Sequence, residues 1–149
     1  MLYVDTGCLL KLYYPEADSG EVAAAVAGQE LCFMALHELE MRTALQLKIF
    51  RGEATPEQAA AARAAAEDDL AAGKLVRVDA DWTGVWRTAQ EYAARHAAST
   101  GCRSLDTLHC ALAAHLGPLE FLSTDARQRA LAGAAGLKLR TLGKSSPLG

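Results

Sequence analysis

Residues 2–15, LYVDTGCLLKLYYP, decide the fold class of this chain. A short apolar run, Leu2–Val4, ends at Asp5-Thr6-Gly7, and after it apolar residues recur at helical spacing until Pro15. This order predicts a buried strand, a tight turn and a helix. A strand that leads directly into a helix is the repeating unit of α/β domains with parallel strands.

The same unit recurs along the sequence. Strands are predicted at 31–34, 74–79, 120–124 and 137–142, and helices at 35–50, 81–99 and 125–135. Further helices are predicted after the capping residues Asp18, Thr55 and Ser104. We therefore expect an α/β fold with a mainly parallel central sheet of about five strands and right-handed crossovers. One domain over residues 1–142 is expected, followed by a mobile tail at 143–149.

Composition narrows the class of protein. The chain has 149 residues, 51% of them hydrophobic and 22% charged, which is enough for one sizeable core. A net charge of -3 argues against a protein that coats nucleic acid non-specifically. Neither a membrane span nor a secretion signal is visible, so we expect a cytoplasmic protein. The four cysteines lack paired spacing and are predicted to be buried free thiols rather than zinc ligands.

Four acidic residues occupy positions from which side chains can meet at one edge of a sheet. Asp5 and Asp125 end predicted strands, Asp106 lies in the first turn of a helix, and Glu40 lies on the helix after the second strand. Clustered carboxylates repel one another and are costly to bury unless a divalent cation lies among them. Mg²⁺ or Mn²⁺ suits such oxygen ligands, and it can activate water for attack on a phosphodiester.

Each acid also has a purely structural interpretation. Asp5 and Asp125 can be helix N-caps, and Asp125 with Gln128 has the spacing of a capping box. Asp106 can simply interact with the helix dipole, and Glu40 can be one solvated acid among many.

Glu40 and Glu38 are separated by about 200° around their helix, so they cannot share one role. Glu40 shares a stripe with Leu36, Thr43, Ala44 and Leu47, which predicts that it faces inward. Glu38 has Arg42 at i+4 as a surface partner. Glu40 is therefore the predicted site residue of the two.

The segments that carry these acids resemble the four acidic motifs of PIN-domain nucleases, and most closely those of VapC-type toxins. They are VDTGCLLKLY (4–13), HELEMRTAL (37–45), SLDTLHCALA (104–113) and FLSTDARQRALA (121–132). The resemblance runs from Leu2 to about Leu142 and implies an α/β/α sandwich. It also implies that Asp5, Glu40, Asp106 and Asp125 bind the metal, with Thr6 and Thr124 as hydroxyl neighbours.

The resemblance implies a Mg²⁺- or Mn²⁺-dependent endoribonuclease, a hydrolase that uses metal-activated water. It further implies the toxin of a type II toxin–antitoxin pair, a homodimer held inactive by a VapB-like antitoxin. Arg103 and Arg127 lie closest to the acids in sequence and are candidates to contact RNA phosphates. His109 is expected to be structural, since a metal-bound hydroxide needs no histidine base.

Two alternatives remain open at this point. One is a non-catalytic PIN-like module that binds RNA or protein, and the other is a housekeeping RNA-processing nuclease without an antitoxin. Asp5-Thr6-Gly7 also occurs in aspartic proteases, but those are almost all β, whereas this chain is rich in helices. A haloacid-dehalogenase-like phosphatase would need a second aspartate where Gly7 stands.

Overall fold

The computed structural model describes residues 1–117 and 119–143 and divides the chain into two compact units. One unit comprises Met1–Asp5 and Asp79–Thr141, and the other comprises Thr6–Val78 with the described residues Leu142 and Gly143. Apart from Gly143, the predicted tail at 143–149 lies outside the described residues. The units are described in turn.

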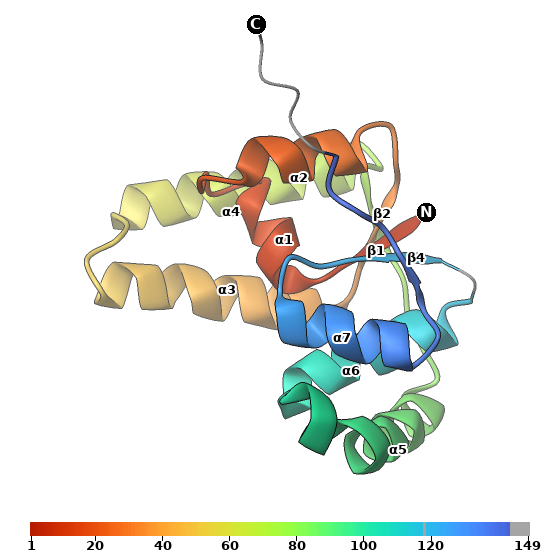
Figure 1. Cartoon of the computed structure of the whole chain (residues 1–149). Helices are drawn as coiled ribbons and strands as arrows, with labels where there is room; N and C mark the ends of the chain where they lie inside the picture. The colour runs from red at the N-terminus through yellow and green to blue at the C-terminus, as the bar shows by residue number, and fades with distance from the viewer. Residues whose placement is uncertain (118, 144–149) are drawn as a thin grey trace, which may run out of the picture. The chain divides into compact units, whose positions relative to one another are not determined.

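The first unit contains three strands and three helices (Figure 1): β1 (Leu2–Val4), α5 (Trp82–Thr100), α6 (Ser104–His115), β4 (Glu120–Leu122), α7 (Ala126–Ala134) and β5 (Lys138–Leu139). β4 pairs in parallel with both β1 and β5, and Tyr3 of β1 lies opposite Phe121 of β4. The rings of these two residues stack with centroids 5.6 Å apart, and both are fully buried. The three helices pack on one another, and α7 packs on β5.

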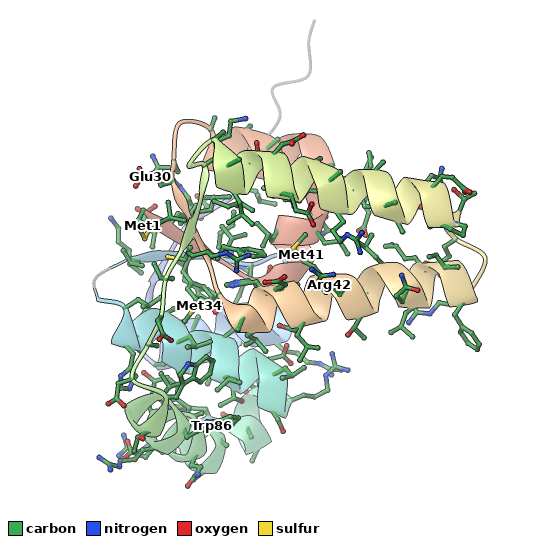
Figure 2. All side chains as sticks on the ribbon, turned by 180° about the vertical axis from the view of Figure 1, so that it is seen from behind. Met1, Glu30, Met34, Met41, Arg42 and Trp86 are labelled. Atoms are coloured by element: carbon green, nitrogen blue, oxygen red, sulfur yellow. The ribbon has the colours of Figure 1, made fainter. Side chains whose placement is uncertain are left out.

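The second unit contains α1 (Thr6–Lys11), α2 (Ser19–Val26), β2 (Leu31–Phe33), α3 (Ala35–Phe50), α4 (Pro56–Ala71) and β3 (Leu75–Arg77). β2 and β3 are parallel, and α3 and α4 lie side by side as a helical hairpin (Figure 1). Figure 2 shows Met41 and Arg42 of α3 beside α4. Alanines 59, 62 and 66 are the buried residues of α4.

Local sequence signals explain several helix ends. At α4, Thr55 Oγ1 accepts from the Gln58 backbone N–H (3.1 Å) and Gln58 Oε1 accepts from the Thr55 N–H (2.9 Å). This is the reciprocal capping box that the spacing of these residues favours. Gly28 and Gly101 follow α2 and α5 with φ of +70°, a left-handed conformation that glycine adopts without strain.

Several predicted details of the elements differ from the structure. Ser104 is the first residue of α6, not its cap, and Arg103 occupies the N-cap position. α2 begins after Asp18 as predicted, but the Asp18 carboxylate pairs with the Lys11 ammonium at 2.6 Å and makes no side-chain cap bond. The last strand was expected over 137–142 but spans only Lys138–Leu139, since its partner β4 is itself only three residues long.

The fold class is confirmed at the level of its elements. The structure contains five strands and seven helices in alternation over the described ranges, and each strand pairing named above is parallel. That is an α/β fold of parallel strands. No helix among the described residues is both long and apolar enough to cross a membrane.

Candidate active site

Three of the predicted site acids belong to the first unit. Asp5 directly follows β1, its backbone N–H donates to the Leu122 carbonyl at 3.0 Å, and its side chain is buried. Asp125 follows β4 as the exposed N-cap of α7, and Asp106 is half-buried in the first turn of α6. Parallel pairing of β1 with β4 therefore brings Asp5 and Asp125 to the same end of the strands.

Ser123 joins these two aspartates. Its hydroxyl donates to Asp5 Oδ2 at 2.5 Å and accepts from the Asp125 backbone N–H at 3.0 Å. The first distance is typical of a hydroxyl bonded to an ionised carboxylate. Ser123 is fully buried, so this hydroxyl has a fixed place at the end of β4. Sequence reasoning selected Thr124 and missed Ser123. A polar residue at the buried end of the run FLS was the available signal.

Gln128 joins Asp125 to Asp106. Its backbone N–H donates to Asp125 Oδ1 at 2.9 Å, which confirms Asp125 as an N-cap. Its side-chain Nε2 donates to Asp106 Oδ1 at 3.5 Å. We call Asp5, Ser123, Asp125, Gln128 and Asp106 the acid network, because hydrogen bonds join them in that order.

Together with burial, the negative charge of the acid network raises the pKa of neighbouring thiols. Burial raises the pKa of the Cys102 thiol, and the carboxylates of Asp106 and Asp125 raise it further. Burial also raises the pKa of Cys110, and the charges of Asp106 and Asp5 act in the same direction. A site with this potential attracts cations.

Arg103 partly balances the negative charge of the acid network. Its backbone N–H donates to Asp106 Oδ2 at 3.1 Å, and its Nε lies 3.7 Å from the same oxygen. The Arg103 side chain is 78% exposed, so most of its guanidinium is available to another anion. Arg127 is exposed on α7 beside Gly101, and its carbonyl accepts from Cys102 Sγ.

Glu40 and Thr6 form a pair within the second unit. Thr6 Oγ1 donates to Glu40 Oε1 at 2.9 Å, and Thr6 is buried while Glu40 is half-buried. The prediction that the Glu40 stripe faces inward holds only for its first turn, because Leu36 is buried whereas Leu47 is 42% exposed. The buried face of α3 is formed instead by Leu36, His37, Met41 and Leu45.

Glu38 has the surface role expected of it. It pairs with Arg42 at 3.0 Å and also with Arg77 at 3.1 Å. The two guanidinium groups hold the pKa of Glu38 below its usual value.

His109 and Thr124 complete the set of predicted residues. His109 is buried and its Nδ1 lies 2.7 Å from the Tyr3 hydroxyl, with the two rings edge to face. These contacts suit the structural role expected of it. Thr124 is half-buried between Ser123 and Asp125.

The oxygen-rich acid network fits a hard divalent cation by the chemistry of its donors. A buried side-chain oxygen, Gln128 Oε1, also lacks a hydrogen-bond partner within the described part of the chain. No group of three or more His, Cys, Asp or Glu side chains among those residues is already placed to hold an ion.

Comparison with known proteins identifies the family of this chain. The sequence model of the PIN-domain family matches residues 2–134. The chain belongs to the PIN-domain family. This PIN domain is also similar to a solved structure described as "Crystal Structure of FitAcB from Neisseria gonorrhoeae", with a TM-score of 0.62 and 16% identity. The similarity covers 95% of this chain and 97% of that one, and it concerns the fold. A search of curated proteins found no match.

The acidic motifs that carried the resemblance all lie within the matched region. All four of Asp5, Glu40, Asp106 and Asp125 fall between residues 2 and 134. The PIN domain also spans parts of both compact units, since the boundary between Asp5 and Thr6 lies inside the match.

Proposed function

We propose that this PIN domain is a Mg²⁺- or Mn²⁺-dependent endoribonuclease that acts as the VapC-type toxin of a toxin–antitoxin pair in the cytoplasm. The acid network carries the proposal: Ser123 Oγ binds the Asp5 carboxylate and the Asp125 backbone N–H, and Gln128 binds the Asp125 carboxylate through its backbone N–H and the Asp106 carboxylate through its side chain. A purely structural set of helix caps would not need Ser123 and Gln128 to link acids on separate elements.

In this proposal Asp5, Asp106 and Asp125 bind the divalent cation, with Glu40 as a fourth acid. The bound ion supplies an acidic water and charge stabilisation for the scissile phosphate. Ser123 fixes the Asp5 carboxylate by its short hydrogen bond. Arg103 and Arg127 are exposed cations of the same unit and would hold RNA phosphates. Hydrolysis would leave a 5′-phosphate and a 3′-hydroxyl, without a covalent enzyme intermediate.

The experiment is cleavage of labelled RNA by the purified protein, with and without EDTA. Activity should disappear in EDTA and return with excess Mn²⁺. Asp106→Asn should lower the rate by about a hundredfold or more, since even residues that support metal ligands cost 10–100-fold. Glu67→Gln, at an exposed position of α4, is the matched control and should leave the rate unchanged. Full cleavage in EDTA, or by Asp106→Asn, would refute the mechanism.

The toxin role has a separate basis. Most large apolar side chains of the first helix and of α3, such as Leu9, Met41 and Leu45, are buried in the structure. The large apolar side chains that remain exposed on α3 are Leu39, Leu47 and Phe50, with Phe50 85% exposed. These residues are candidates for the homodimer or antitoxin contact.

Growth assays test the toxin role. Expression of the chain alone should arrest growth, and co-expression with a small neighbouring antitoxin gene should restore it. Harmless expression combined with RNA cleavage in vitro would favour the housekeeping nuclease. Absence of cleavage combined with RNA binding would favour the non-catalytic module.

A further inference from the structure

Gln128 is the third residue of α7, and it is 3% exposed amid the carboxylates of the acid network. We infer that Gln128 is a positioning residue of the metal site: Nε2 holds the Asp106 carboxylate, and Oε1 accepts a hydrogen bond from a water molecule that the divalent cation carries. This inference rests on the proposed metal-dependent function.

The first observation is that the Gln128 side chain does not make the capping contact that its position in the helix favours. A glutamine at the third helical position usually turns back to the N-cap backbone N–H and completes a capping box. Here the Asp125 N–H donates to Ser123 Oγ instead. The Gln128 side chain is thereby released and reaches across to Asp106 on α6. The side chain therefore connects α7 to α6 and does not cap its own helix.

The second observation is the unpartnered oxygen at the other end of the amide. Gln128 Oε1 is a buried acceptor to which no donor points within the described ranges. The reversed amide orientation would set Oε1 against an Asp106 oxygen, so the orientation with Nε2 toward Asp106 is the favourable one. Buried polar atoms are nearly always hydrogen-bonded, and the exceptions are found where a ligand or water completes the set.

A hydrated divalent cation supplies the missing donor. Mg²⁺ usually retains several water molecules when carboxylates bind it, and each of those waters donates hydrogen bonds. Oε1 and Nε2 share one amide carbon, so the acceptor lies within the same cluster as Asp106. Groups that orient ligands or ligand waters in this way tune metal affinity even though they do not touch the ion.

The test is Gln128→Met, which keeps the length of the side chain and removes the amide. Mn²⁺ binding is measured by calorimetry without RNA, and thermal unfolding is measured in EDTA. We expect the dissociation constant for Mn²⁺ to rise about tenfold or more. The unfolding temperature in EDTA should stay equal or rise, because the buried unpaired oxygen is gone. Gln90→Met, at an exposed position of α5, is the control and should change neither quantity.

A merely structural glutamine would give a different pattern, with lower stability in EDTA and unchanged Mn²⁺ affinity per folded molecule. That result would overturn the inference. If the variant does not fold, the wild-type protein provides the measurement: the ¹⁵N side-chain amide signal of Gln128 should shift during a Mg²⁺ titration, and that of Gln90 should not. Mg²⁺ binding without a Gln128 shift would overturn the inference alone. Absence of binding by either ion would overturn the metal-dependent function with it.

Discussion

Replacement of Ser123 by alanine removes only one hydroxyl group, but it should destabilise the metal-free protein strongly. The hydroxyl donates to the buried Asp5 carboxylate at 2.5 Å and accepts from the Asp125 N–H at 3.0 Å. A hydrogen bond to a charged group contributes about 1.5–3 kcal/mol, and a neutral one about 0.5–1.5 kcal/mol. Because Asp5 is only 5% exposed, water does not readily replace the lost donor. We therefore expect Ser123→Ala to lower the free energy of unfolding by about 2–4 kcal/mol.

Urea unfolding in EDTA measures this quantity. Ser104→Ala is the matched control, since Ser104 is exposed at the start of α6 in the same unit. Its effect should stay within about 0.5 kcal/mol. In a thermal scan, a loss of 2–4 kcal/mol in a chain of this size corresponds to roughly 5–15 °C. If Ser123→Ala were no more destabilising than Ser104→Ala, the hydrogen bonds of Ser123 would not hold the acid network together.

Further predictions concern the two glutamates of α3 and the thiols. Glu40→Gln should abolish RNA cleavage and Glu38→Gln should retain it, and the opposite result in the same assay would refute the assignment of Glu40. Because Arg42 and Arg77 lower the pKa of Glu38, its stabilising effect is present above the usual glutamate pKa and is lost as pH falls through the lowered value. Glu38→Gln should therefore cost under about 1 kcal/mol at neutral pH and nothing in strong acid, as urea unfolding at both pH values would show. In the native protein a thiol reagent should modify Cys102 first, and comparable rates at the buried thiols of Cys8, Cys32 and Cys110 would contradict the burial that the structure assigns them.

Much of the fold was predictable because its signals are local. Short apolar runs predicted the strands that end before Asp5, near Met34 and at Leu122. Helical periodicity placed α3 at 35–50, as observed. Thr55, Pro56 and Gln58 predicted the start of α4, because a capping box involves only neighbours in the chain. At Asp18 the predicted helix start is correct, but the cap bond is absent, because the carboxylate pairs with Lys11 outside the helix.

In the candidate site, too, local features were predictable from the sequence and long-range contacts were not. The sequence by itself determined that Asp5 and Asp125 follow strands and that Asp106 lies at a helix start, and it led us to propose Glu40 rather than Glu38 as a site residue. Only the tertiary structure decided that Ser123 joins Asp5 to Asp125 and that Gln128 turns from its own helix cap toward Asp106. Asp5 and Ser123 are separated by 118 positions in the chain. Their contact depends on the parallel pairing of β1 with β4, and no pattern of neighbouring residues encodes which strands pair.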